Sequence, residues 1–243
     1  MSMFNGQSVL ITGGTGSFGN AFIRKILGSY NPARIVVYSR DELKQSEMEH
    51  AINDKRIHFV IGDIRDKERL TEAMQGVDFV VHAAALKHVP ITERNPMECV
   101  KTNVFGGQNV IDAALQQNVK QVVSLSTDKA ANPVSIYGAS KLIADKLFVA
   151  ANHIIHPSQT KFSIVRYGNV AGSRGSVLAQ FKKIAVANKS EFPITDLRMT
   201  RFWLTVSHGV DFTIEVFQRM RGGEIFVPKV PSVKIKDLVE SMS

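Results

Sequence analysis

The sequence has little of what marks membrane, secreted and metal-binding proteins. Cys99 is the single cysteine among 243 residues, so no internal disulfide is possible, and we expect its small side chain to be packed. No apolar run approaches the roughly 18 residues of a transmembrane helix, and the first residues lack the basic and long apolar regions of a secretion signal. The histidines are dispersed without the spacing of a metal site. We therefore expect a cytoplasmic protein with no membrane segment and no bound metal.

The net charge of +8 raises the question of nucleic-acid binding. Lysine and arginine residues are scattered along the chain, however, with no basic run and no aromatic residues arranged for stacking around them. A cofactor and a substrate that both carry phosphates explain the excess charge equally well. We therefore predict small anionic ligands rather than a nucleic-acid partner.

Short apolar runs rich in Val and Ile alternate with longer amphipathic stretches. Nearly continuous apolar runs are typical of strands buried on both faces, so the alternation predicts a parallel sheet covered by helices on both sides. The fold class is therefore α/β, a doubly wound, Rossmann-like parallel sheet whose ligand crevice lies at the C-terminal ends of the strands. The predicted strands are Ser8–Thr12, Arg34–Ser39, Ile57–Gly62, Asp78–Ala83, Gln121–Ser126, Lys161–Arg166 and Glu224–Val227. The predicted helices are Phe18–Gly28, Asp41–Ala51, Lys67–Gln75, Pro96–Gln117, Tyr137–Ala151 and Val206–Met220.

Two stretches depart from this alternation. Residues 168–198 contain glycine and serine, then basic residues, and show no clear strand, while residues 230–243 begin a helix at Lys236–Met242 and then stop. We predict a nucleotide-binding domain formed by residues 1–167 and 199–229. Residues 168–198 and 230–243 are expected to form part of a small substrate-binding region, incomplete because the unfinished end indicates a fragment of a longer protein.

The first predicted strand leads directly into a glycine-rich segment. Gly13 permits a tight turn, Gly16 lets the backbone approach a pyrophosphate, and Gly19 lets the following helix pack closely on the sheet. The free N–H groups at the start of that helix then face the anion. A simple glycine-rich turn is the alternative, but the position at the first strand–helix junction favours a dinucleotide site. The other residues predicted to bind the cofactor in this segment are Thr15, Ser17 and Phe18.

The end of the second predicted strand indicates which dinucleotide binds. Ser39 and Arg40 end that strand, and Lys44 lies one turn into the next helix. Arg40 and Lys44 would both attract a 2′-phosphate, so the pattern favours NADP over NAD. Asp41 keeps NAD open, because NAD enzymes place an acid near this point to bind the ribose 2′-hydroxyl.

The ends of the third and fourth strands are expected to line the rest of the cofactor. The Asp63 carboxylate would accept a hydrogen bond from the adenine amino group, and Ile64 would cover the face of the ring. A turn or capping carboxylate is an equally good interpretation of Asp63. The small side chain of Ala83 would let the backbone approach the cofactor's ribose.

The fifth strand and the helix after it carry the residues expected to perform chemistry. Tyr137 and Lys141 lie four residues apart and so on one helical face, after the strand-end hydroxyl of Thr127. The Lys141 ammonium would lower the pKa of the phenol so that Tyr137 can take a hydroxyl proton near neutral pH, and it would also hold the nicotinamide ribose. A lone Tyr-x-x-x-Lys is common by chance, but within a dinucleotide-binding fold it indicates hydride transfer.

An acid and an amine, Asp128 and Lys129, stand between these elements. Simple alcohol oxidation has no need of them. A surface ion pair is the ordinary interpretation of such a dipeptide. The position between Thr127 and Tyr137 favours a catalytic role instead.

Seven segments together resemble the extended short-chain dehydrogenase/reductases: TGGTGSFG, YSRDELKQSEM, HAAALKHVP, STDKAANP, YGASK, RYGNVAGSRGSV and ITDLRMTRFW. Within that family they resemble the inverting UDP-N-acetylglucosamine 4,6-dehydratases, which begin pseudaminic acid synthesis in flagellated bacteria and so serve flagellin glycosylation. The related retaining dehydratases generally carry Met where Tyr137 stands. The dTDP-glucose and GDP-mannose dehydratases generally carry Glu where Lys129 stands. Both differences favour the inverting enzymes.

The resemblance implies NADP as the cofactor, UDP-N-acetylglucosamine as the substrate, and a homo-oligomer, either a dimer or a hexamer. It implies that Tyr137 deprotonates the C4 hydroxyl of the sugar while a hydride leaves C4. Lys129 then removes the C5 proton, and Asp128, if protonated, donates to the departing C6 hydroxyl. The hydride returns to C6, and reprotonation of C5 from the opposite face inverts that centre.

The resemblance also implies where the substrate binds. It places Lys87 and Asn169 beside the sugar, with Lys87 also near the cofactor, and it places Val170 next to the nicotinamide. Arg166, on the same strand as Asn169, is expected to pair internally. Val177 and Leu178 would cover the uracil or the sugar, and Thr195 and Arg201 would bind the diphosphate. A charge that merely flanks a helix is the alternative for Arg201.

Other functions remain open from the sequence. A UDP-sugar 4-epimerase needs Tyr137, Lys141 and NAD(P) but has no role for Asp128 and Lys129. A retaining 4,6-dehydratase differs in its configuration at C5. A non-catalytic NADP-sensing module is a third possibility, although a sensor has no use for the Thr127, Tyr137 and Lys141 arrangement.

Overall fold

The structure is a computed structural model, and its central feature is a parallel sheet. The structure describes residues 3–154, 159–171, 181, 184–186, 192–194 and 196–241. Within them seven strands are hydrogen-bonded in the order β3-β2-β1-β4-β5-β6-β9, and each neighbouring pair is parallel. The strands are β1 Ser8–Thr12, β2 Arg34–Ser39, β3 Ile57–Ile61, β4 Phe79–His82, β5 Gln121–Thr127, β6 Lys161–Tyr167 and β9 Ile225–Phe226. The order reverses between β1 and β4, which confirms the predicted doubly wound fold.

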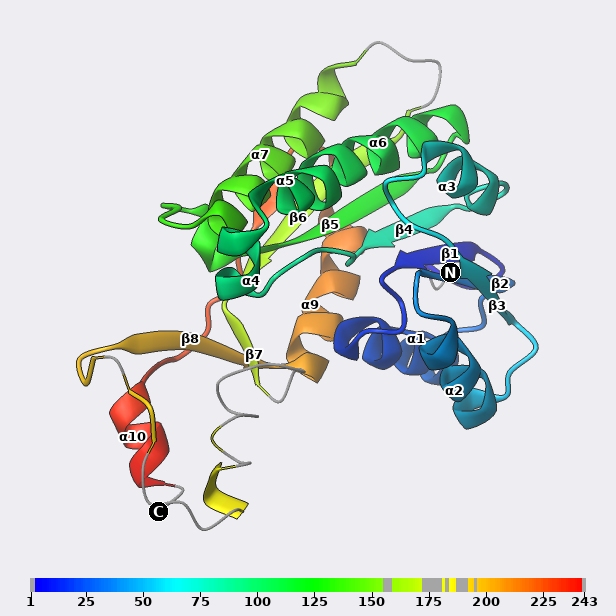
Figure 1. The fold of residues 1–243 in the computed structure, drawn as a ribbon. Helices are drawn as coiled ribbons and strands as arrows, with labels where there is room; N and C mark the ends of the chain where they lie inside the picture. Colours follow the sequence, from blue (N-terminus) through cyan, green and yellow to red (C-terminus); the bar gives the residue numbers. More distant parts are fainter. Residues whose placement is uncertain are drawn as a thin grey trace.

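Helices cover both faces of this sheet (Figure 1). α3, α5, α6 and α7 lie on one face, and α1, α2 and α9 lie on the other. The helices are α1 Ser17–Ser29, α2 Glu42–Ile52, α3 Lys67–Ala73, α4 Val89–Arg94, α5 Pro96–Val100, α6 Gly106–Gln116, α7 Ile136–Ala150, α9 Val206–Arg219 and α10 Ile235–Glu240. Short 3₁₀ turns span Asp128–Ala130 and Ala151–His153. None of the helices in the described part of the chain combines the length and apolar character needed to cross a bilayer.

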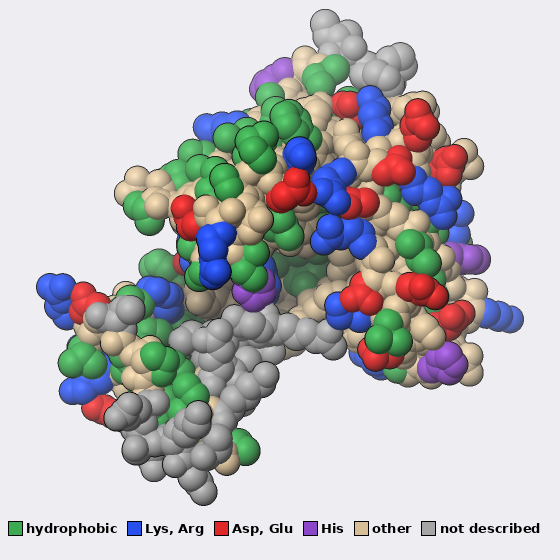
Figure 2. Space-filling view, viewed as in Figure 1, with side chains coloured by type: hydrophobic (Ala, Val, Ile, Leu, Met, Phe, Trp, Pro, Cys, Tyr) green, Lys and Arg blue, Asp and Glu red, His purple; other side chains and the backbone are tan. Residues whose placement is uncertain are grey.

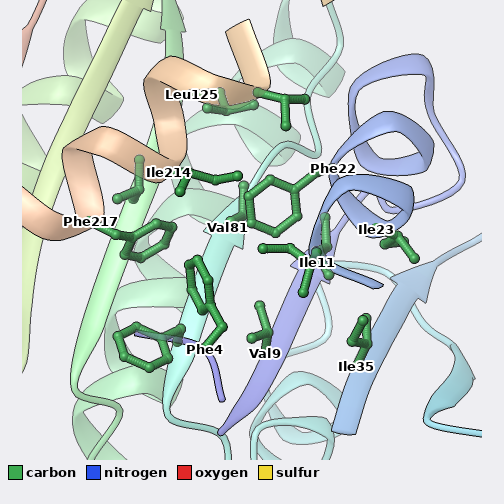
Figure 3. Close-up of a cluster of buried hydrophobic side chains, with 14 of the residues drawn as sticks. Phe4, Val9, Ile11, Phe22, Ile23, Ile35, Val81, Leu125, Ile214 and Phe217 are labelled. Atoms are coloured by element: carbon green, nitrogen blue, oxygen red, sulfur yellow. The ribbon is translucent and has the colours of Figure 1, made fainter. Parts of the chain in front are cut away.

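Alternate side chains of each strand pack into two separate hydrophobic cores, because successive residues of a strand point to opposite faces of the sheet. Val9 and Ile11 of β1 pack under α1 and α9, where Phe22 and Phe217 are fully or almost fully buried (Figure 3). Leu10, between them, joins the core on the α3, α6 and α7 side. Burial of each such side chain stabilises the fold by roughly 1.5–3 kcal/mol. The two cores fix the strand ends on which the site is built.

A second, small sheet follows the C-terminal end of β6. It contains β7 Asn169–Ala171, β8 Thr200–Thr205 and β10 Ser232–Lys234 in the order β10-β8-β7. The expectation of no strand within residues 168–198 is therefore wrong, because three-residue strands are too short to show a period. β8 belongs to this small sheet, although the sequence assigns residues 199–229 to the nucleotide-binding domain. The last helix begins one residue earlier than predicted, at Ile235.

The long helix predicted for Pro96–Gln117 is interrupted in the structure. A π-helical segment, Lys101–Phe105, separates α5 from α6, and α4 precedes them without having been predicted. π-helical segments inside longer helices are frequently found at functional sites. Here the segment brings Asn103 into the interior, where the side chain is almost fully buried.

Candidate active site

The turn after β1 has the geometry that a dinucleotide needs. Gly13 has φ +66°, and a Cβ added there would lie 2.9 Å from backbone atoms of Ala84. A Cβ added at Gly19 would lie 2.3 Å from the Gly14 carbonyl oxygen, so α1 packs directly on the turn. Only glycine fits both places.

The start of α1 is open to an anion. Gly16 is its N-cap residue, and no side chain in the described structure caps the 13-residue helix. Its first N–H groups and the positive end of the helix dipole therefore face the glycine turn. The space left by the missing side chains of Gly13 and Gly19, together with this helix end, fits the pyrophosphate of a nicotinamide dinucleotide. Thr15, Ser17 and Phe18 lie in or just after the turn, as the sequence places them.

Arg40 and Lys44, the two cations predicted to select NADP, are not equally available to bind a 2′-phosphate. The Lys44 ammonium is paired with Asp41, which also caps α2 by accepting from the Lys44 backbone N–H at 3.0 Å. The Ser39 hydroxyl accepts a hydrogen bond from Gln45 Nε2 at 3.0 Å. The Arg40 side chain is 56% exposed, with Nη1 3.5 Å from Asp63 Oδ2. Arg40 is thus the more open of the two cations.

Asp63 and Ile64 are held by neighbouring parts of the protein. Asp63 Oδ2 accepts from Arg65 Nη2 at 2.7 Å, and Asp63 Oδ1 accepts from the Arg65 backbone N–H at 3.0 Å. Burial pushes the pKa of Asp63 upward, but the Arg65 hydrogen bonds and the charge of Arg40 outweigh it, so the pKa is lowered. The Ile64 side chain is 4% exposed and packs against Gly106 of α6. Contact of either residue with adenine stays a prediction.

The group at the end of β5 comes together around Thr127. Thr127 Oγ1 donates to Asp128 Oδ1 at 2.9 Å and accepts from the Lys129 backbone N–H at 3.3 Å, so it caps the 3₁₀ turn. Lys129 Nζ lies 3.1 Å from Asp128 Oδ1 and 3.4 Å from Asn169 Oδ1. The acid, the amine and the amide oxygen thus form one connected cluster at the C-terminal edge of the sheet.

Tyr137 enters this cluster from the first turn of α7. Ser135 caps that helix by accepting from the Gly138 backbone N–H at 3.2 Å. A Cβ added at Gly138 would lie 2.4 Å from the Lys129 carbonyl oxygen, so this glycine lets α7 approach the 3₁₀ turn. The Tyr137 hydroxyl is hydrogen-bonded with Thr127. Four of the predicted catalytic residues therefore meet: Thr127, Asp128, Lys129 and Tyr137.

The ionisation of Tyr137 differs from the sequence-based prediction. Burial raises the pKa of Tyr137 to about 12, the Thr127 hydrogen bond opposes this rise, and the Asp128 charge adds to it. Lys141 was expected to lower this pKa. Instead its Nζ donates to the Leu125 carbonyl oxygen at 2.7 Å. Burial outweighs the charge of an ammonium that is directed to a backbone carbonyl.

The remaining predicted residues lie around the same edge of the sheet. Lys87 is exposed in the loop after β4, Val170 lies in β7, and Arg201 lies in β8 with Nη1 donating to the Thr200 carbonyl at 2.8 Å. Ala83 follows β4 and is partly buried. Val177, Leu178 and Thr195 fall outside the described residues. No group of three or more His, Cys, Asp or Glu side chains in the described chain is placed to hold a metal ion.

Asn103 is a site residue that the sequence analysis missed. Its Oδ1 accepts from the Leu86 backbone N–H at 2.8 Å, and its Nδ2 donates to the Leu86 carbonyl at 2.9 Å and to Ser140 Oγ at 2.9 Å. It therefore ties the loop that carries Lys87 to α7. The sequence held one signal for this role, since Asn103 places an amide on the apolar side of a predicted helix.

The sheet order, the glycine turn, and Tyr137 with Lys141 on α7 beside Thr127 define an extended short-chain dehydrogenase/reductase. The chain belongs to the family of polysaccharide biosynthesis proteins, which matches residues 9–243.

Relatives and solved structures support this assignment. An inverting UDP-N-acetylglucosamine 4,6-dehydratase of Campylobacter jejuni subsp. jejuni serotype O:23/36 is 58% identical over 241 residues, which cover 99% of this chain and 72% of that protein. A UDP-glucose 4-epimerase of Rickettsia prowazekii is 42% identical and covers 99% of this chain and 71% of its own. The X-ray structure of Pen from Bacillus thuringiensis matches with a TM-score of 0.95 at 42% identity, covering 99% of this chain and 74% of that one. The dTDP-glucose 4,6-dehydratase DesIV from Streptomyces venezuelae, solved with NAD and TYD bound, matches with a TM-score of 0.88 at 26% identity, covering 97% and 80%.

Proposed function

We propose that this protein is an inverting UDP-N-acetylglucosamine 4,6-dehydratase that works with a tightly held NADP. The observation that carries the proposal is the hydrogen bond of 3.1 Å between Lys129 Nζ and Asp128 Oδ1, next to Tyr137. An oxidoreductase that only interconverts an alcohol and a ketone has no use for this acid and amine. The name of the 58% identical Campylobacter relative supports the same activity.

The glycine turn of Gly13, Gly16 and Gly19 would hold the cofactor, which would supply the hydride chemistry of the reaction, from C4 of the sugar and back to C6. The protein supplies the proton transfers. Tyr137, once its phenol is ionised, takes the C4 hydroxyl proton on its phenolate oxygen, and Thr127 orients that oxygen by hydrogen bonding. The ketone formed at C4 acidifies the neighbouring C5–H bond, which prepares the second proton transfer.

The Asp128–Lys129 pair provides both groups that the elimination needs. Movement of one proton along the hydrogen bond from Lys129 Nζ to Asp128 Oδ1 yields a neutral amine and a carboxylic acid. The amine removes the C5 proton, and the acid protonates the C6 hydroxyl, which leaves as water. Reprotonation of C5 from the opposite face then inverts that carbon. The net change is loss of one water, so no external reductant is required.

The small sheet and the adjoining loops are proposed to bind the UDP-sugar. Lys87 and Asn169 are proposed to contact the sugar, and Arg201 of β8 is proposed to bind the diphosphate through its guanidinium. Val170 is proposed to lie beside the nicotinamide. The same region of the chain includes Val177, Leu178 and Thr195, for which the proposed contacts rest on the sequence alone.

A UDP-sugar 4-epimerase is the second candidate. It is favoured by the name of the 42% identical Rickettsia relative and by the Tyr137–Lys141 pair, which an epimerase also needs. The mass of the product separates the two activities, because dehydration lowers the mass of UDP-N-acetylglucosamine by one water and epimerisation leaves it unchanged. A product of unchanged mass would reject the dehydratase.

The cofactor preference gives a prediction at Arg40. Arg40→Ala is expected to raise the dissociation constant for NADP by about 10- to 100-fold, because a charge-assisted contact with the 2′-phosphate is lost. The dissociation constant for NAD should change little. Arg24→Ala, at an exposed position on α1, serves as the control. Calorimetric titration with both dinucleotides measures the effect, and an equal loss for both would contradict NADP selection by Arg40.

The glycine turn gives a second prediction. Gly19→Ala is expected to weaken dinucleotide binding at least tenfold and to destabilise the fold by about 1–3 kcal/mol, because the new methyl group meets the Gly14 carbonyl at 2.3 Å. Gly28→Ala on the same helix is the matched control, since a Cβ there has no heavy atom within 4 Å in the described structure. The control should bind normally and unfold at the same or a slightly higher temperature. Similar behaviour of both variants would exclude a tight fit at Gly19.

The protein is further proposed to form a homo-oligomer in the cytoplasm and to supply pseudaminic acid synthesis. Its buried, unpaired Cys99 suits a reducing compartment. Hydrophobic side chains gather over α5 and α7, whereas charges of both signs are interspersed around α3 (Figure 2). The exposed apolar residues in and around these helices are Ile91, Met97, Phe105, Val134 and Ile143. Such a patch suits contact with a second copy.

A further inference from the structure

Asp145 is a carboxylate buried beneath the catalytic residues. It lies on α7 with 0% exposure. Its Oδ2 accepts from Ser126 Oγ at 2.9 Å and pairs with Arg166 Nε at 2.7 Å. Its Oδ1 has no hydrogen-bond partner within the described residues. The pairing confirms that Arg166 is used internally, with a partner that the sequence alone does not reveal.

The position of Asp145 links it to Lys141. It follows Lys141 by four residues and so lies on the same face of α7, one turn further on. Lys141 Nζ binds the Leu125 carbonyl, and Asp145 binds Ser126, the next residue of β5. Arg166 is the β6 neighbour of Ser126 in the strand register. An ammonium, a carboxylate and a guanidinium therefore lie in sequence between α7 and two central strands.

Such an arrangement is costly for stability alone. Buried ion pairs lose hydration, and well-packed apolar side chains of similar volume often replace them without loss of stability. The unpartnered Oδ1 adds to this cost. A charge placed one turn from a catalytic dyad under these conditions indicates a role in that dyad.

We propose that Asp145 is a positioning residue that keeps Lys141 protonated and sets how readily Tyr137 gives up its proton, with Arg166 balancing the added negative charge. This inference rests on the proposed function, because it concerns the Tyr137–Lys141 pair in that reaction. Asp145 itself is too deeply placed to touch the substrate.

The charges around Lys141 agree with this role. Burial lowers the pKa of Lys141, and the Asp145 carboxylate opposes that effect. The same carboxylate, after burial and the effects of Thr127, Asp128 and Cys99, adds to the rise in the pKa of Tyr137. Of the other groups that face Lys141, His82 on β4 is neutral, since burial and the Lys141 charge lower its pKa to about 3, and Cys99 on α5 contributes a smaller effect.

The test removes the negative charge of Asp145 and keeps the shape of its side chain. In Asp145→Asn the pKa values of Lys141 and Tyr137 both fall, so the whole pH profile of kcat/KM for dehydration should move to lower pH by about one unit. Asp145→Asn/Arg166→Gln, which does not leave the Arg166 guanidinium without its carboxylate, should fold and show a smaller shift in the same direction. Ser126→Ala is the control, because it removes a hydrogen bond to Asp145 but no charge, and its profile should stay in place.

A second readout does not depend on turnover. The near-ultraviolet absorbance of tyrosinate is followed during alkaline titration, and each protein is compared with its counterpart carrying Tyr137→Phe. The Tyr137 midpoint should be lower with Asp145→Asn, alone or in the double variant, than in the unchanged protein. Lower activity without any shift in either readout would reduce Asp145 to a structural residue and overturn the inference. If the unchanged protein does not dehydrate the substrate, the proposed function fails, and the absorbance titration alone decides the role of Asp145.

Discussion

Lys129→Ala is expected to slow the loss of water about 1000-fold while C4 oxidation continues. The reason is that Lys129 Nζ, held 3.1 Å from Asp128 Oδ1 and 3.4 Å from Asn169 Oδ1, is the base proposed for the C5 proton. Without it the oxidised sugar has no partner for the second proton transfer. Rapid mixing with UDP-N-acetylglucosamine should therefore show the absorbance of reduced cofactor rising and persisting, with almost no dehydrated product.

Lys129→Arg separates charge from proton transfer. The guanidinium keeps the positive charge near Asp128 but does not become neutral at ordinary pH, so this variant should be as slow as Lys129→Ala. Lys146→Ala, at an exposed lysine of α7, should behave as the unchanged protein does. Water loss at more than one tenth of the normal rate in both Lys129 variants would remove this residue from the mechanism.

Tyr137→Phe is expected to abolish the reaction at its first step, with turnover lowered about 10³- to 10⁴-fold. Phenylalanine keeps the ring but cannot accept the C4 hydroxyl proton, so neither reduced cofactor nor product should form. Because burial raises the pKa of Tyr137 to about 12, the unchanged protein should also react faster as pH rises from neutral. Stopped-flow absorbance and product analysis across pH measure both effects.

The control for Tyr137→Phe is Tyr30→Phe. Tyr30, at the end of α1, packs edge to face with Phe4 at a centroid distance of 5.2 Å. Its loss of a hydroxyl should leave the rate unchanged. Dinucleotide binding should persist in both variants. Formation of reduced cofactor by Tyr137→Phe at the normal rate would assign the first proton transfer to another group.

The main sheet could be predicted because each of its strands is an apolar run buried from both sides. β1 and β2 were predicted with their observed ends, Ser8–Thr12 and Arg34–Ser39. β7 and β10 could not be, because three residues define no period and their pairing partners are distant in sequence. The π-helical segment Lys101–Phe105 escaped for a similar reason, since it depends on tertiary contacts of Asn103 rather than on local pattern.

The candidate site was predictable where it depends on spacing. Thr127, Asp128 and Lys129 are consecutive, and Tyr137 lies in the first turn of the next helix, so the topology of the fold brings them to one edge. The pKa of Tyr137 was predicted in the wrong direction, because the sequence does not reveal how deeply its hydroxyl is buried. Asp145, on α7, was missed because its partner Arg166 is 21 residues away on β6.

The most direct test of the whole account is incubation with UDP-N-acetylglucosamine in heavy water, followed by NMR of the product. The account predicts a 4-keto, 6-deoxy sugar nucleotide that has lost one water, carries deuterium at C5 and has the inverted configuration there. A 4-epimer with its C6 hydroxyl intact, or a dehydrated product without deuterium at C5, would contradict proton transfer at C5 by the Asp128–Lys129 pair.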